Sequence, residues 1–238
     1  MEIPRRFNGP PDSGNGGYSC GVLAAHVDAP AVEVSLRRPP PLERPLRVEE
    51  RDGTVVALDG DDVVAEARPV ALDVDPPPAV SIEHAVAADA RSTYRDAELH
   101  WFDTCFVCGP SRGEGDGLRM FPGPLGEDGD QYATVFRPDA SVADASGCVR
   151  PEVVWAALDC PTSAPIADWN DERPPSVLAR FAVRIDEPPR AGRSYVVRSW
   201  PLGEDDRKRH AAAAMYAPDG RLVALARALW IELRARPE

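Results

Sequence analysis

The segment RPEVVWAALDCPTSAPI, residues 150–166, decides the fold because it is apolar on nearly every side. Such a helix is typical of one that the rest of its domain surrounds. Pro151 suits the first helical position, where its missing N–H has no partner, and Glu152 suits the positive end of the helix dipole. Asp159 follows near the end of the apolar pattern, where the dipole does not favour a negative charge. A carboxylate buried there costs stability unless it has a partner or a catalytic task.

Composition and charge exclude several classes of partner and indicate where the protein acts. The 238 residues carry a net charge of −12, and nucleic acids or anionic membranes need a basic face, so neither is an expected partner. The chain has no run of about 18 apolar residues and no apolar signal segment at its start, which favours a soluble, cytoplasmic protein. Its five cysteines are an odd number and indicate reduced thiols rather than a disulfide framework.

Helical and strand patterns occur in the same order in the two halves. In the first half a helix is expected over residues 18–27 and strands over 32–36, 46–50, 54–58 and 63–71. A proline-rich boundary at 75–78 and a short helix over 81–90 follow. In the second half strands over 118–121 and 131–137 precede the helix at 150–166, and strands over 177–185, 194–202, 210–216 and 222–233 come after it. Residues 3–7 allow one further short strand.

The matching order predicts an internal repeat. Asn15-Gly16-Gly17 falls on residues 150–152, the run 32–36 falls on 181–185, and the run 63–68 falls on 222–227. Each unit then has a helix too apolar to stand in water and an antiparallel sheet to wrap round it. Two such units can pair edge to edge. Chance similarity between strands rich in Ala and Arg is the alternative.

Three segments resemble hotdog-fold thioesterases of the tandem, or double-hotdog, kind. CFVCGP at 105–110 with GLR at 117–119 is similar to the entry motif of the PaaI-like and THEM4-like group. WAALD at 155–159 resembles the central helix with its acid, and DGRLVALARALWIEL at 219–233 resembles the closing strands. The resemblance implies an α+β pseudo-dimer of two antiparallel sheets, each wrapped round a central helix. Its domains would span 1–75 and 105–238, with a linker and short helix over 76–104.

The resemblance also implies a site between the units. In the PaaI-like family a His-Gly-Gly turn opens the helix and an acidic residue follows at the ninth position. Here the first half has Asn15-Gly16-Gly17 but Ala24 at that position, whereas the second half has Asp159 but residues 150–152 in place of the turn. We therefore expect one composite site, in which Asn15-Gly16-Gly17 faces Asp159. The mirror site, in which residues 150–152 face Ala24, is expected to be inactive.

This composite site predicts an acyl-CoA thioester hydrolase. Glycine amides at a helix start can hold the thioester carbonyl oxygen, while the acid orients or deprotonates water, or attacks directly. No cofactor is expected, and the protein is expected to act as a monomeric pseudo-dimer or a homodimer. The alternative function is a non-catalytic protein that binds acyl-CoA or another apolar ligand. The residues expected to contact substrate are Tyr18, Trp155, Thr162 and Ser163.

Simpler interpretations of the same residues stay open. The carboxylate of Asp159 can cap a loop or bind an arginine, and Asn15-Gly16-Gly17 can be a plain helix cap. Cys105 and Cys108 can be half of a zinc site with His100 or Cys148, although one such pair is only two ligands of four and no metal is expected. Two further alternatives are a Cys160 nucleophile, and CoA phosphates bound by Arg37, Arg38 and Arg184.

Overall fold

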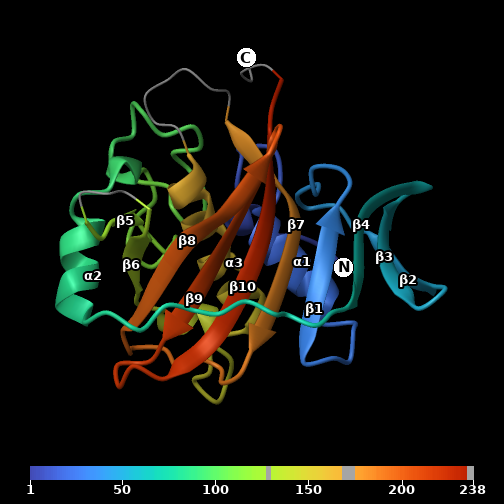
Figure 1. Ribbon diagram of the computed structural model, residues 1–238. Coiled ribbons are helices and arrows are strands. Elements are labelled where there is room, and N and C mark those ends of the chain that lie inside the picture. Colours follow the sequence, from blue (N-terminus) through green and yellow to red (C-terminus); the bar gives the residue numbers. More distant parts are fainter. Residues whose placement is uncertain (127–129, 168–174, 235–238) are drawn as a thin grey trace.

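A ten-stranded antiparallel sheet forms the framework of the computed structural model, which describes residues 1–126, 130–167 and 175–234 (Figure 1). The strands follow one another across the sheet in the order β2-β3-β4-β1-β7-β10-β9-β8-β6-β5. Their bounds are β1 Ala31–Leu36, β2 Arg47–Arg51, β3 Thr54–Asp59, β4 Asp62–Pro69, β5 Gly123–Pro124, β6 Tyr132–Phe136, β7 Ser176–Ile185, β8 Tyr195–Asp205, β9 Lys208–Tyr216 and β10 Leu222–Glu232.

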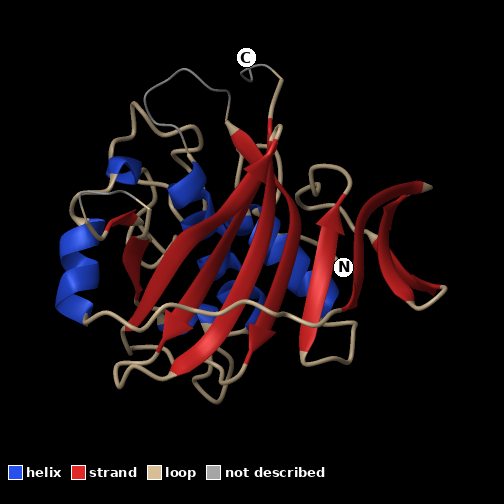
Figure 2. Cartoon of the chain, in the orientation of Figure 1, coloured by secondary structure: helices blue, strands red, loops and turns tan. Residues whose placement is uncertain are grey.

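Two helices, α1 (Gly16–Ala24) and α3 (Pro151–Ser163), lie together on one face of this sheet (Figure 2). Every residue of α3 from Val153 to Thr162 is buried, as its nearly continuous apolar pattern predicts. The helix begins at Pro151, where the pyrrolidine ring costs no hydrogen bond. The short 3₁₀ turn Ala164–Ile166 continues it to the end of the predicted segment.

Glycine allows α1 and α3 to touch through their backbones. A Cβ on Gly17 would lie 2.5 Å from the Asp159 Cβ and 2.7 Å from the Trp155 carbonyl oxygen. A Cβ on Gly21, one turn later, would lie 2.6 Å from the Glu152 Cα. The start of α1 is therefore fixed against the end of α3.

The same strand order occurs on both sides of the β1–β7 pair. One side reads β2-β3-β4-β1 and the other reads β8-β9-β10-β7. Val34 of β1 pairs with Ala67 of β4, and its counterpart Val183 of β7 pairs with Ala226 of β10. The described strands lie in one continuous sheet, because β1 and β7 pair along their edges, with Glu33 opposite Ala182. Edge-to-edge pairing of the two units was expected to join their sheets in this way.

The opposite face of the sheet is covered by the segment between the halves. Leu72, Val74 and Ala79 pack over a buried cluster of β9 and β10 that includes Tyr216. The Tyr216 hydroxyl donates a hydrogen bond to the Pro77 carbonyl. Figure 1 shows this segment running across the strands from β4 to α2 (Ile82–Asp89), which packs on β6 and β8. The linker is therefore part of the packed structure.

Two of the predicted strands are wrong. Residues 118–121 are not a strand: Arg119 has a φ of 51°, which breaks the extended conformation, and the N–H groups of Leu118 and Met120 bond the carbonyls of Phe106 and Val107 instead. The short strand expected over 3–7 is replaced by a 3₁₀ turn, Arg5–Phe7, after an isolated bridge at Ile3. Phe7 packs on Tyr18 of α1, whereas the Phe121 N–H donates to Asp89 at the end of α2.

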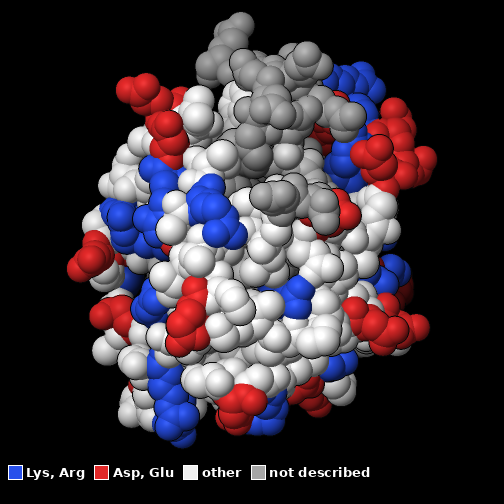
Figure 3. Space-filling model, turned by 60° about the vertical axis from the view of Figure 1, so that its left-hand side comes forward, with Lys and Arg blue, Asp and Glu red and all other residues white. Residues whose placement is uncertain are grey.

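Acidic and basic side chains are interspersed on the face shown in Figure 3, around an area with few charges. Many arginines pair with carboxylates at the surface, for example Arg37 with Glu66 and Arg38 with Asp62. Within the described residues, no helix is long and apolar enough to cross a membrane.

Gly21→Ala should destabilise the protein. In a free helix this change is favourable by about 1 kcal/mol, but the added methyl group meets the Glu152 backbone, and overpacking typically costs about 1–3 kcal/mol. We expect a net loss of about 1–2 kcal/mol in the free energy of unfolding, measured with urea. Gly113→Ala is the matched control, because nothing lies within 4 Å of its Cβ position, and it should change stability by less than about 0.5 kcal/mol. A Gly21→Ala protein as stable as wild type would contradict the tight helix contact.

Candidate active site

A cavity of about 530 Å³ lies where the start of α1 meets the end of α3. Ligand pockets of proteins commonly have this size. Its walls also include the end of β1, the start of β7, the end of β10 and the loop that contains Trp101 and Cys105. The apolar side chains in this lining include Leu36, Trp101, Phe102, Ile166, Val177, Leu178 and Trp230. The cavity thus offers apolar volume beside a few polar groups.

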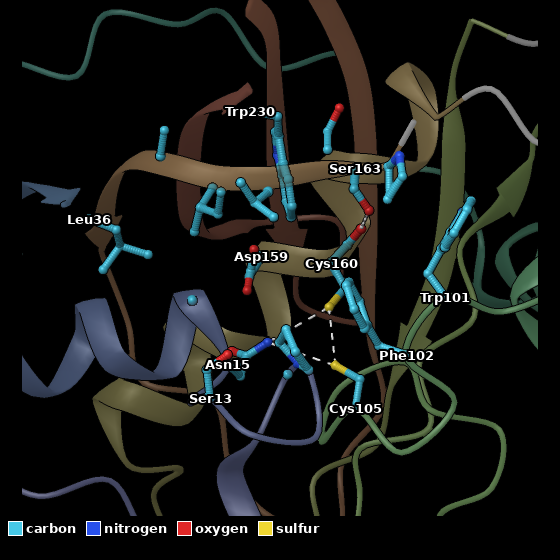
Figure 4. A pocket seen from close by; sticks show the side chains of 18 of the residues that line it. Ser13, Asn15, Leu36, Trp101, Phe102, Cys105, Asp159, Cys160, Ser163 and Trp230 are labelled. Carbon is cyan, nitrogen blue, oxygen red and sulfur yellow. Dashed lines mark hydrogen bonds between the residues drawn. The ribbon is translucent and has the colours of Figure 1, made fainter. Parts of the chain in front are cut away.

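Asp159 is the buried carboxylate of this cavity, with 2% of its surface exposed. The Gly17 N–H donates a 2.8 Å hydrogen bond to its Oδ2 atom. Its Oδ1 atom is buried and has no hydrogen-bond partner among the described residues. Figure 4 shows the carboxylate directed into the space below Trp230. One oxygen is therefore held in place, while the other has no hydrogen bond among the described residues.

Burial controls the proton affinity of this carboxylate. Loss of solvation raises the pKa of Asp159 to about 7, and the nearby Cys105 adds to the increase. The hydrogen bond from the Gly17 N–H and the nearby Asn15 amide act in the opposite direction and favour the charged form. A group with this pKa exchanges a proton readily near neutral pH, as general acid–base catalysis requires.

The turn Asn15-Gly16-Gly17 opens α1 beside Asp159. The Asn15 side chain caps the helix, because its Oδ1 atom accepts a 2.9 Å hydrogen bond from the Tyr18 N–H. Gly16 lines the cavity, and a Cβ on it would lie 3.5 Å from the Asp159 Oδ2 atom and 2.9 Å from Leu178. No described residue accepts a hydrogen bond from the Gly16 N–H. The Gly17 N–H, which we expected to face a substrate, bonds the acid instead.

Tyr18 and Trp155 do not line the cavity, contrary to the expectation that they contact substrate. The Tyr18 ring is buried and stacks on Phe7, with centroids 3.9 Å apart. Trp155 is buried and packs edge to face on Phe181 at 5.6 Å. Both side chains leave the helix pair on sides that face the protein core, so both expectations are corrected.

Thr162 and Ser163 differ in their surroundings. Thr162 is fully buried outside the cavity lining, where it donates to the Asp159 carbonyl and accepts from the Trp230 indole N–H at 2.9 Å. Ser163 lines the cavity and forms a 2.6 Å hydrogen bond with the Tyr94 hydroxyl. Thr162 therefore orients a wall residue, and only Ser163 of the four expected contacts reaches the cavity.

Three cysteine sulfurs meet at one side of the cavity. Cys105 and Cys108 come from the loop before β5, and Cys160 comes from α3. Cys148, considered at the sequence level as a partner of the first two, is not in this group. Hydrogen bonds with Cys105 and Cys108, together with burial, raise the pKa of the Cys160 thiol well above its usual range, which disfavours the nucleophilic thiolate.

The mirror end of the helix pair lacks these features. Pro151 has no N–H to offer, and Ala24 stands where the second acid would be. Arg150 lies over the Phe7 ring, 5.7 Å from its centroid, and forms an ion pair with Glu152 at 3.6 Å. Only the end of the helix pair that contains Asp159 therefore combines a buried acid with glycine N–H groups.

Sequence reasoning did not assign several wall residues to the site. Trp230 and Leu178 belong to β10 and β7, whose alternating pattern marks them as inward-facing but does not reveal a cavity. Arg37 and Arg38, considered for CoA phosphates, do line the cavity, whereas Arg184 is outside its lining and pairs with Asp186. Whether such residues line a cavity depends on how the ends of several strands meet in the folded protein, which the sequence pattern does not show.

No protein-family model and no curated protein matches the chain. Solved structures do match it. The tesB protein of Mycobacterium avium subsp. paratuberculosis is 14% identical, with a TM-score of 0.54 over 86% of this chain and 78% of that one. A protein assigned as a thioesterase II from Thermobifida fusca YX is 16% identical, with a TM-score of 0.58 over 98% and 91%. An acyl-CoA thioesterase II from Mycobacterium marinum is 14% identical, with a TM-score of 0.53 over 85% and 79%.

At these identities the likeness concerns the fold alone. The chain has the fold of hotdog thioesterases, which confirms the expected resemblance at that level. The narrower PaaI-like and THEM4-like grouping stays a prediction.

The buried acid should make stability depend on pH. The pKa of Asp159 is higher in the folded than in the unfolded protein, so the unfolded state ionises first and wild type loses stability as pH rises from about 4 to about 7. Asp159→Asn removes this loss. We expect the variant to exceed wild type by about 2–4 kcal/mol at pH 8, and by much less at pH 4.5. Urea unfolding in EDTA-containing buffer measures the difference; an equal difference at both pH values would contradict the raised pKa.

Proposed function

We propose that the chain is an acyl thioester hydrolase that acts on acyl-CoA at a single composite site. The observation that supports this most is the position of Asp159. Its carboxylate lies in an apolar cavity, bonded across the helix pair to the Gly17 N–H, with its Oδ1 atom unpartnered among the described residues. The contact between an acid from the second half and a helix-start amide from the first supports the proposal.

The architecture that we propose for this site is a tandem of two hotdog units acting as a pseudo-dimer. The N-terminal unit would span residues 1–75 and the C-terminal unit 105–238, with 76–104 as the linker. The equal strand orders and the matching pairings of Val34 and Val183 support this interpretation. Such a duplication puts α1 and α3 in the positions that two separate subunits would otherwise supply.

In the proposed reaction Asp159 acts as general base. Its Oδ1 atom takes a proton from water, and the water oxygen attacks the thioester carbonyl carbon. The Gly16 N–H, at the positive end of α1, stabilises the negative charge that develops on the carbonyl oxygen. The tetrahedral intermediate then expels the CoA sulfur, which receives the proton held by Asp159. Gly17 acts as a positioning residue because its N–H fixes the acid.

The cavity walls include groups that suit an acyl chain and groups that suit a charged carrier. Trp230, Leu178 and Phe102 provide apolar surface near Asp159, whereas Arg37 and Arg38 also contribute to the lining. These arginines are about half exposed in their ion pairs with Glu66 and Asp62. Exposed ion pairs of this kind contribute little, so phosphate groups of CoA can displace the carboxylates.

Replacement of the acid tests the proposal. Asp159→Asn should reduce kcat by about 10²–10⁴-fold, because a general base contributes about that much. Glu152→Gln, which removes the same charge from the start of α3 at the mirror end, should leave kcat within about twofold. Release of free thiol from a panel of acyl-CoA substrates measures both. Equal losses in the two variants, or none in either, would contradict the composite site.

A binding measurement separates hydrolysis from the second candidate function, non-catalytic binding of acyl-CoA. The apolar cavity serves either function, so ligand binding is measured by calorimetry alongside thiol release. Wild type that binds acyl-CoA but releases no thiol would support the binding protein and exclude the hydrolase. Retained ligand binding by Asp159→Asn would show that its lost turnover does not come from a lost fold.

A further inference from the structure

Three buried thiols from two distant segments converge beside the Asp159 cavity. The sulfur atoms of Cys105, Cys108 and Cys160 all lie within 4.8 Å of one another. Cys105 and Cys160, which are 55 positions apart in the chain, have their sulfurs 3.7 Å apart. All three residues line the cavity, so a cation or water that enters it can reach them. The proposed hydrolysis uses none of them.

The spacing of these sulfurs fits a tetrahedral zinc ion. With Zn–S bonds of about 2.3 Å, two thiolates of a tetrahedral site lie about 3.8 Å apart. The Cys105–Cys160 distance already has this value, and the remaining pairs need to close by at most about 1 Å. Three thiolates leave one of the four positions open, and the cavity lies on that side.

Hydrogen-bond donors surround the sulfurs in the way that metal-bound thiolates require. The Asn15 Nδ2 atom donates to the sulfurs of Cys105 and Cys160, at 3.9 and 3.8 Å, as the dashed lines in Figure 4 show. The backbone N–H groups of Val107 and Cys108 help to lower the pKa of the Cys105 thiol and so favour its thiolate. Such outer contacts orient the ligands of metal sites and offset their negative charge.

The turn between the first two cysteines depends on a glycine. A Cβ on Gly109 would lie 2.5 Å from the carbonyl oxygens of both Asp103 and Cys105. The absence of that Cβ lets the chain fold back after Cys108, so that both thiols face α3. This C-x-x-C-G turn therefore presents its two sulfurs to one point, where Cys160 supplies the third.

We propose that Cys105, Cys108 and Cys160 bind one Zn²⁺ ion, with the fourth coordination position open to the cavity. Binding forms three Zn–S bonds and releases to solvent the protons of those ligands that are thiols, which leaves a centre of charge −1 facing the Asn15 amide. The ion ties the loop that carries Cys105 to the end of α3. The site includes Cys160, which the sequence did not connect with the C-x-x-C pair, and excludes Cys148.

Metal content of the full chain tests the site. The protein is stripped with a chelator under reducing conditions, exposed to zinc sulfate and freed of excess metal. We expect about one zinc per chain and a higher Tm than in the stripped protein, because binding to the folded state stabilises it. Cys105→Ser and Cys160→Ser should each lower the zinc content at least about tenfold, and Cys148→Ser should bind as wild type does. No retained zinc, or equal retention in Cys160→Ser, would overturn the proposal.

A cobalt titration of stripped wild type keeps the test decisive if a serine variant fails to fold. Co²⁺ bound by thiolates should give sulfur-to-metal charge-transfer absorption in the near ultraviolet that saturates at about one equivalent. Absence of this band would also overturn the site. Asp159→Asn should retain the zinc content of wild type, so loss of hydrolysis and loss of metal binding are distinguishable results.

Discussion

The hydrogen bond from the Gly17 N–H to the Asp159 carboxylate joins the two halves where their helices touch. It exists because Gly17 and Gly21 have no side chains to hold α1 away from α3. The same closeness removes Asp159 from water, and this burial is the main cause of its raised pKa. Helix packing, the position of the acid and its proton affinity thus have one origin.

Most of the helices and strands could be predicted because their signals are local. The turns at Asp52-Gly53 and Gly60 have the positive φ angles that hairpins require, and they separate strands as expected. The pairing of Asn15-Gly16-Gly17 with Asp159 could be inferred because the repeat relates the starts of α1 and α3. The failed strand at 118–121 shows the limit, since the positive φ of Arg119 comes from tertiary contacts.

The directions of side chains on α3 could not be predicted. A helix that is apolar all round has no polar face to show which side looks into a cavity. Trp155 was therefore assigned to the substrate although it packs on Phe181, and Cys160 was not connected with Cys105. The use of the Gly17 amide by the acid itself depends on a helix separation that no sequence pattern encodes.

The difference between the two ends of the helix pair has an energetic reason. Burying one carboxylate already costs free energy, which is only partly offset by the Gly17 N–H. By the repeat, a second acid at Ala24 would lie beside Pro151, which has no N–H, and beside Glu152, whose negative side chain would repel it. With a single buried acid, the helix pair avoids doubling that cost.

The linker over the outer face of the sheet affects how copies of the protein can associate. Leu72, Val74 and Ala79 cover β9 and β10, and the linker is fastened by hydrogen bonds from Tyr216 to Pro77 and from Arg198 to Pro78. A second molecule cannot pack its sheet against this area unless the linker is first displaced from β9 and β10. Back-to-back assembly is therefore blocked over β9 and β10, and larger oligomers would have to be built from other surfaces.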